Sequence, residues 1–148
     1  MVFNLKLLII IMANQKINNK VMAIVVSEKG KFLLLKTNPK TMKQDIWFVV
    51  TGSIEKGETK EEAVKREVDE ETKLEILEIK QTDYKCDYEW PKGSGKINHE
   101  EAFIVKVKEA PVKISKWEHL DYKWLNKEQF LELIDWADNK ELLKRLIE

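Results

Sequence analysis

The sequence has a single cysteine, Cys86, among its 148 residues. One cysteine cannot form an intramolecular disulfide, and it cannot supply a zinc site built from several thiolates. The sequence is therefore typical of a protein that works in a reducing compartment. Cys86 lies in the alternating stretch 84–88, which indicates a strand, so we expect this thiol to pack against its neighbours rather than to act as a nucleophile.

An excess of charge of either sign is also missing. The 26 Lys and Arg residues equal the 26 Asp and Glu residues, so no overall positive field is available to hold a nucleic-acid backbone. With 43% hydrophobic and 35% charged residues, the chain has the composition of a folded globular protein. Its length suits one hydrophobic core, and we expect a single domain over residues 1–148.

No hydrophobic run is long enough to span a membrane. Residues 5–12 (LKLLIIIM) are apolar apart from Lys6, but a spanning helix needs about 20 apolar residues. No A-x-A cleavage site follows the run, as a signal peptide would require. We treat residues 1–15 as an N-terminal extension that forms an extra strand or helix, or that precedes a start at Met12. We expect a cytoplasmic protein without membrane or nucleic-acid partners.

Hydrophobic patterning predicts an α/β fold. The predicted strands are 21–27, 31–36, 46–51, 74–79, 82–88 and 102–107. Polar stretches with proline or glycine predict loops at 37–45 and 91–95. A capping-box pattern at Thr59 and Glu62 begins a central helix of about four turns, and helical spacing recurs at 128–134 and 141–147. Strands on both sides of a central helix favour a sheet covered on its two faces, an α/β sandwich.

The central helix is the most informative segment, because three of its glutamates fall on one side. At about 100° per residue, Glu67, Glu70 and Glu71 share an arc of roughly 100°. A charge-rich surface helix is the simpler explanation, but it does not account for this convergence. Like charges held this close repel unless a cation lies among them, and oxygen ligands suit a hard divalent cation. The sequence therefore predicts a site for Mg²⁺, with Mn²⁺ as the alternative, that bridges to substrate phosphates.

A short loop before this helix completes a recognisable motif. Gly52 and Gly57 supply backbone that a phosphate or metal can approach closely. Residues 52–74 resemble the Nudix box, G-x5-E-x7-R-E-U-x-E-E-x-G-U, in which U is aliphatic. The matching positions are Gly52, Glu58, Arg66, Glu67, Val68, Glu70, Glu71 and Leu74. Lys73 stands at the second glycine, where a left-handed helix end would cost it on the order of 1 kcal/mol or the turn would differ.

The resemblance implies a Nudix-type α/β/α sandwich with a mixed sheet and a loop-helix-loop catalytic motif, which hydrolyses pyrophosphate bonds in nucleotides. The metal ligands that it implies are Glu67, Glu70 and Glu71. Arg66 and Glu58 would orient these ligands through ion pairs. The family often takes a further carboxylate from outside the box, and here Glu100, preferred to Glu101, would act as a base or an additional ligand.

Two stretches outside the helix, 47–58 and 117–134, resemble the bacterial dATP pyrophosphohydrolases, which also act on dihydroneopterin triphosphate. Diadenosine tetraphosphate hydrolases are the alternative. They share Glu118 and His119 but carry Pro-Lys-Gly where this chain has Val-Thr-Gly at 50–52. A nucleotide-binding module of the family that has lost catalysis is a further alternative, which the intact set of helix glutamates disfavours.

The expected partner is a small-molecule nucleotide. Its base would stack on an aromatic face, and Trp47 and Tyr84 are the candidates, although both also suit the core. His119 is expected to have a structural role. A homodimer is compatible with the sequence.

Overall fold

The computed structural model describes residues 17–136 and 138–148. The apolar run 5–12 and the whole proposed N-terminal extension 1–15 lie outside these residues. The strands are β1 (Ile17–Ser27), β2 (Phe32–Thr37), β3 (Trp47–Phe48), β4 (Val50–Ser53), β5 (Ile76–Glu89), β6 (Ile97–Val107) and β7 (His119–Leu125). The helices are α2 (Pro39–Met42), α3 (Lys60–Thr72), α4 (Lys127–Leu133) and α5 (Lys140–Leu146). Within the described ranges, no helix has the length and apolarity needed to cross a bilayer.

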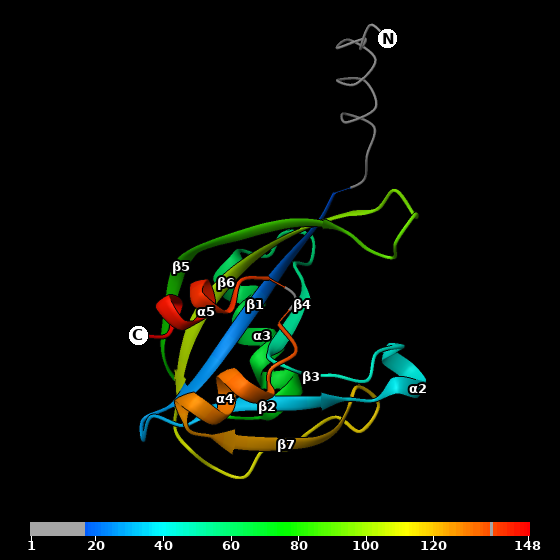
Figure 1. The fold of residues 1–148 in the computed structure, drawn as a ribbon. Helices are drawn as coiled ribbons and strands as arrows, with labels where there is room; N and C mark the ends of the chain where they lie inside the picture. Colours follow the sequence, from blue (N-terminus) through cyan, green and yellow to red (C-terminus); the bar gives the residue numbers. More distant parts are fainter. Residues whose placement is uncertain (1–16, 137) are drawn as a thin grey trace, which may run out of the picture.

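The strands form one mixed sheet around β1. Strand β1 runs parallel to β6 from Ile17 opposite Ile97 to Ser27 opposite Val107, and it is antiparallel to β4 and β2. Strand β5 pairs with β6 at one side, while β3 and β7 both pair with β2 at the other. Figure 1 shows β1 crossing the middle of the molecule between these two parts.

Each face of the sheet has its own hydrophobic core. On one face, Ala63, Val64 and Val68 of α3 pack against alternate residues of the strands, such as Val21 and Phe103. The other core contains Phe130 of α4, Leu143 of α5 and the intervening strand residues, such as Ile24. Helices α4 and α5 therefore lie in front of the sheet in Figure 1 and α3 behind it. The predicted α/β sandwich with a mixed sheet is confirmed.

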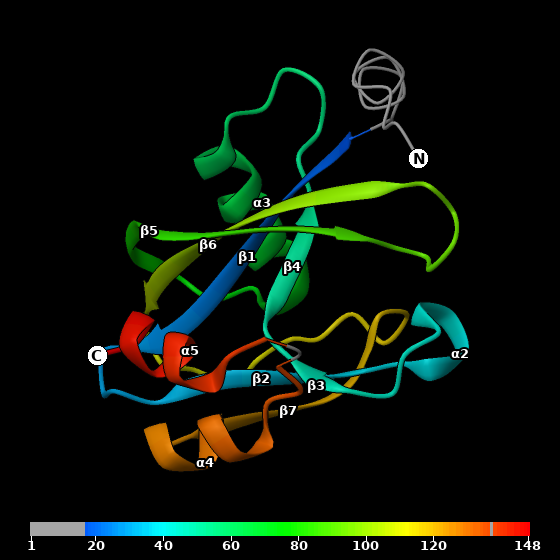
Figure 2. The same cartoon turned by 45° about the horizontal axis from the view of Figure 1, so that its top comes forward.

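Three local predictions differ from the structure. The predicted strand 46–51 is divided at Val49, because β3 pairs with β2 whereas β4 pairs with β1. The predicted loop 37–45 contains the short helix α2, which Asn38 caps and Pro39 begins. The strands predicted at 74–79 and 82–88 are the single strand β5, which carries an irregular register between Gln81 and Lys85. The hairpin that joins β5 to β6 extends away from α4 and α5 (Figure 2).

Helix α3 begins and ends at residues that the sequence singles out. The Thr59 side chain accepts a hydrogen bond from the backbone N–H of Glu62 at 3.1 Å, as the capping pattern predicts. At the other end, Lys73 has the left-handed φ of 60° and ψ of 22°, and its N–H donates to the Asp69 carbonyl. Lysine thus adopts the conformation for which a glycine is usually required.

Replacing Lys73 by glycine should stabilise the protein. Glycine relieves the steric cost of a side chain in the left-handed region, so Lys73→Gly is expected to raise the free energy of unfolding by about 1 kcal/mol. Urea denaturation measures this change. Lys65→Gly, at an exposed position inside the same helix, should instead lower the free energy by about 1 kcal/mol. Equal effects of the two substitutions would show that the helix end carries no strain.

Candidate active site

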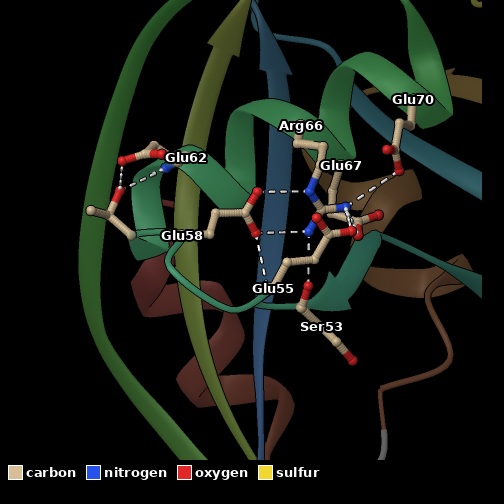
Figure 3. Close-up of polar contacts among 8 residues, drawn as sticks. Ser53, Glu55, Glu58, Glu62, Arg66, Glu67 and Glu70 are labelled. Carbon is tan, nitrogen blue, oxygen red and sulfur yellow. Dashed lines mark hydrogen bonds and ion pairs between the residues drawn. The ribbon is translucent and has the colours of Figure 1, made fainter.

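Arg66 of α3 holds the loop and the helix glutamates together (Figure 3). Its guanidinium donates to both carboxylate oxygens of Glu58, at 2.7 Å from Nε and 2.9 Å from Nη2. Nη1 donates to Glu67 at 2.7 Å and to Glu70 at 3.4 Å, and Nη2 also donates to the Ser53 carbonyl at 2.9 Å. One planar cation thus orients three acidic side chains and ties β4 to α3.

Glu58 closes the loop before α3. Its Oε1 accepts the backbone N–H of Glu55 at 3.0 Å and one bond from Arg66, while Oε2 accepts the other bond from Arg66. The hydrogen bonds from Arg66, followed by the backbone donor, lower the pKa of Glu58 to about 2. The preceding residue, Gly57, has a φ of +82°, which suits glycine and lets the chain turn toward the helix.

The Glu58 ion pair should give stability that depends on pH. Because the pKa of Glu58 is lower in the folded protein than its ordinary value of 4.5, the contribution is complete above that value and is lost as the pH falls toward 2. The difference in urea midpoint between the wild type and Glu58→Gln should therefore stay constant near neutral pH and shrink in acid. Glu61→Gln, exposed on the same helix, corrects for the loss of one charge. A difference that does not change with pH would contradict the pairing.

Gly52 allows β4 to lie directly against the acidic face of α3. A methyl group in place of a Gly52 hydrogen would lie 2.0 Å from Cδ and 2.1 Å from Oε1 of Glu67. The Glu67 side chain is only 12% exposed, and this burial raises its pKa against the opposing effect of Arg66. The glycine of the motif is thus explained by packing against one named carboxylate.

Glu71 is the most unusual member of the acidic face. It is only 5% exposed, and among the described residues its buried Oε2 has no hydrogen-bond partner. Burial and the negative charges of Glu67, Glu118 and Glu70 raise the pKa of Glu71 well above its ordinary value. A buried carboxylate without a donor is costly, so this side chain is suited to a cation as its partner.

A second segment contributes groups that the sequence interpretation did not assign to the site. Glu118 and His119, at the start of β7, each place one ligand atom within 4.8 Å of a Glu71 oxygen and of each other. Burial lowers the pKa of His119 to about 4, which keeps its imidazole neutral. Its buried Nδ1 has no hydrogen-bond partner among the described residues. His119, which the sequence suggested to be structural, thus also lies next to the acidic face of α3.

The structure does not bring Glu100 to α3. Successive residues of β6 point to opposite faces of the sheet, and Glu100 lines a pocket on the face away from α3. Glu101 lies on the α3 side, where Lys60 at the first position of the helix pairs with it at 2.8 Å. His99 contacts the same carboxylate at 3.1 Å. The carboxylate from outside the motif that approaches Glu71 is Glu118 instead.

The two aromatic residues suggested for base stacking lie in different places. Tyr84 lines the pocket that contains Glu100, together with Phe48 and Trp136. Trp47 is not among the pocket residues, and the ammonium groups of Lys36 and Lys123 lie over its ring at 5.9 and 5.0 Å from the centroid. Of the two residues suggested for base stacking, only Tyr84 therefore lies where a ring could be enclosed.

The site as a whole combines a rigid cationic support with an acidic face. The groups of the predicted motif that lie together are Gly52, Glu58, Arg66, Glu67, Glu70 and Glu71. The glutamates of α3 and Glu118 offer several carboxylate oxygens close together, with too little positive charge to neutralise them. This donor set fits a hard divalent cation and the oxygens of a phosphate chain bound to it.

Known proteins share both the sequence pattern and the fold. The chain is 27% identical over 149 residues to the dihydroneopterin triphosphate diphosphatase of Haemophilus influenzae, with 93% of this chain and 92% of that protein covered. The structure of the E. coli dihydroneopterin triphosphate pyrophosphohydrolase superimposes with a TM-score of 0.68 at 23% identity, covering 87% and 94% of the two chains. An Ap4A hydrolase from C. elegans gives a TM-score of 0.65 at 22% identity, covering 88% and 92%. The NUDIX domain matches residues 16–146, so the chain belongs to the NUDIX family and is a Nudix hydrolase.

Proposed function

We propose that the protein is a Mg²⁺-dependent pyrophosphohydrolase that converts a nucleoside triphosphate or a close analogue to the monophosphate and pyrophosphate. The observation that carries the proposal is the buried Glu71 carboxylate, which has no donor among the described residues and lies beside Glu67, Glu70 and Glu118. A protein that used α3 only as a surface helix would have no reason to bury this charge. We assign the reaction to the cytoplasm, where nucleotide substrates are found.

The residues present fit a divalent cation. Glu67, Glu70 and Glu71 would hold it, and Glu118 lies close to Glu71 without being needed as a ligand. Such an ion would supply electrostatic stabilisation for the negative charge that builds on phosphate oxygens during cleavage. Mg²⁺ is the first choice because it is bound by few carboxylates and shares its remaining positions with water and phosphate; Mn²⁺ is the alternative.

The protein groups have distinct tasks in hydrolysis. Arg66 fixes the positions of Glu67 and Glu58, so that the loop and helix form one rigid cradle for the phosphates. A water molecule attacks phosphorus, the bond from that phosphorus to the bridging oxygen breaks, and the water gives up a proton. We assign Glu118 to accept this proton, since it forms no ion pair with any described residue and adjoins Glu71.

For the substrate, we favour dihydroneopterin triphosphate or dATP. Support comes from the similarity to the Haemophilus influenzae dihydroneopterin triphosphate diphosphatase over nearly the whole length of both chains. The similarity of the fold to an Ap4A hydrolase keeps diadenosine tetraphosphate as the second candidate. A binding module without catalysis is disfavoured because it would have no need for the unpaired Glu71.

A substrate panel tests this proposal. The protein is incubated with Mg²⁺ and, separately, with dihydroneopterin triphosphate, dATP, diadenosine tetraphosphate or ADP-ribose, and the products are identified by ³¹P NMR. We expect pyrophosphate from one of the first two substrates. Faster cleavage of the dinucleotide would instead support the second candidate, and the absence of turnover with both Mg²⁺ and Mn²⁺ would reject the enzyme.

A further inference from the structure

The face of the sheet opposite α3 carries a pocket of about 610 Å³. Aromatic side chains form much of its wall. Trp136 lies 6.1 Å from Phe48 and 5.4 Å from Tyr84, measured between ring centroids, and Tyr88 and Trp90 line the pocket as well. A space of this size with aromatic walls suits a flat heterocyclic ring.

The pocket adjoins the acidic site through β4. Thr51 lines the pocket, whereas the next residue, Gly52, packs against Glu67 on the other face. Consecutive residues of one strand thus touch the two regions. A ligand whose ring occupies the pocket could therefore extend its phosphates past β4 to α3.

Glu100 is the buried charge of this pocket. It is only 6% exposed, and it lies beside Lys20, its partner in the parallel pairing of β1 and β6. Burial raises the pKa of Glu100, while the positive charge of Lys20 and the nearby Tyr88 hydroxyl oppose that rise. Both polar neighbours thus favour the ionised carboxylate.

The Glu100 carboxylate is not engaged in an ion pair with another described side chain. Within residues 17–136 and 138–148, Glu100 forms no ion pair, whereas Lys60, Lys85 and His99 contact the adjacent Glu101. A buried carboxylate in an aromatic pocket, with oxygens left for further bonds, calls for N–H donors from a ligand. A carboxylate can accept two parallel N–H bonds at once.

We propose that Glu100 is a specificity-determining residue that accepts two hydrogen bonds from a ring N–H and a neighbouring exocyclic amino group of the substrate. Guanine and the pterin ring of dihydroneopterin both present this pair of donors. Adenine presents one amino donor beside a ring nitrogen that is an acceptor, and that lone pair would face the second carboxylate oxygen. The inference deepens the proposed function, on which it rests, and it favours the pterin substrate over dATP.

The proposal gives Glu100 a different task from that of a base or metal ligand. A base or ligand would affect every substrate equally, because all substrates share the reacting phosphates. A residue that recognises the ring affects only those substrates whose ring makes the bonds. The ratio of kcat/KM between substrates therefore separates the two roles.

The test uses Glu100→Gln, which keeps the size of the side chain but offers one acceptor and one donor. We expect kcat/KM for dihydroneopterin triphosphate and dGTP to fall about 10- to 100-fold, while that for dATP changes by less than about threefold. Glu78→Gln, an exposed glutamate on β5, is the matched control and should leave all three unchanged. A parallel loss for all three substrates, or no loss for any, would overturn the proposal.

Binding of the ring alone separates this inference from the proposed hydrolysis. Neopterin and adenosine, which lack phosphates, are titrated without metal and followed by fluorescence. We expect the wild type to bind neopterin more tightly than adenosine, and Glu100→Gln to lose that preference. If the protein hydrolyses no substrate but prefers neopterin to adenosine, the proposed hydrolysis is wrong and the proposed recognition by Glu100 is supported. If it hydrolyses its substrates but binds neopterin and adenosine equally well, the proposed recognition is wrong and the proposed hydrolysis is supported.

A second variant tests the same proposal if Glu100→Gln does not fold. Tyr88→Phe removes the hydroxyl that supports the carboxylate. It should weaken neopterin binding at least about threefold without a comparable effect on adenosine. Equal effects on the two ligands would overturn the proposal, because they would show that Tyr88 serves only as an aromatic wall.

Discussion

Glu71→Gln is expected to make the metal-free protein more stable and to abolish its activity. In the absence of a cation, the Glu71 carboxylate is buried beside Glu67 and Glu118 without a donor. Removing its charge should raise the free energy of unfolding by about 1 kcal/mol, whereas loss of a ligand should reduce kcat/KM at least about 100-fold. Calorimetry in EDTA and steady-state kinetics with Mg²⁺ measure the two effects.

A gain in stability together with a loss of activity is expected only when the substituted carboxylate has a functional role. A residue buried for structural reasons would destabilise the protein when substituted, and activity would fall only with folding. Mg²⁺ should also raise the Tm of the wild type and leave that of Glu71→Gln unchanged, because only the former binds the ion tightly. Glu61→Gln, exposed on the same helix, should alter neither quantity. A Tm of Glu71→Gln below that of the wild type in EDTA would contradict the explanation of its burial.

Gly52→Ala should have the second large effect. The new methyl group cannot share space with Glu67, whose Cδ would lie 2.0 Å away, so that carboxylate must leave its hydrogen bond with Arg66. Displacement of a catalytic group by about 1 Å can cost about 100-fold in rate. We expect kcat to fall by that factor, with a loss of about 1 to 3 kcal/mol in stability from overpacking. Measuring kcat well below the Tm separates the catalytic effect from the loss of stability.

Ser53→Ala is the control for this substitution. It changes the neighbouring residue of β4 but keeps the Ser53 carbonyl that accepts from Arg66. Its activity should therefore stay within about threefold of the wild type. If Gly52→Ala were as active as Ser53→Ala, the close approach between β4 and Glu67 would have no catalytic importance.

The sequence predicts the motif well because its determinants are local. Thr59, the spacing of Val64 and Val68, and the arc of glutamates all concern residues within one helix, where geometry follows directly from the periodicity. The motif also predicts a left-handed helix end at position 73, and the structure shows that Lys73 adopts this conformation. The order of strands and helices predicts that helices cover both faces of the sheet.

The face on which Glu100 lies could not be predicted in the same way. Strand β6 is central and buried on both sides, with Phe103 in one core and Ala102 in the other. Both faces are apolar, so alternation shows that Glu100 and Glu101 diverge but not which of them faces α3. The contribution of Glu118 depends on the pairing of β7 with β2, a contact between distant segments that no local pattern contains.

The central claim is that the glutamates of α3 act together in cleaving a pyrophosphate bond. Its most direct test is the rate of pyrophosphate release from dihydroneopterin triphosphate with Mg²⁺, for the wild type and for Glu70→Gln, whose side chain is largely exposed and whose substitution should leave folding intact. We predict release by the wild type and at least about a 100-fold lower rate for the variant at an unchanged Tm. Equal rates for the two proteins would contradict the claim.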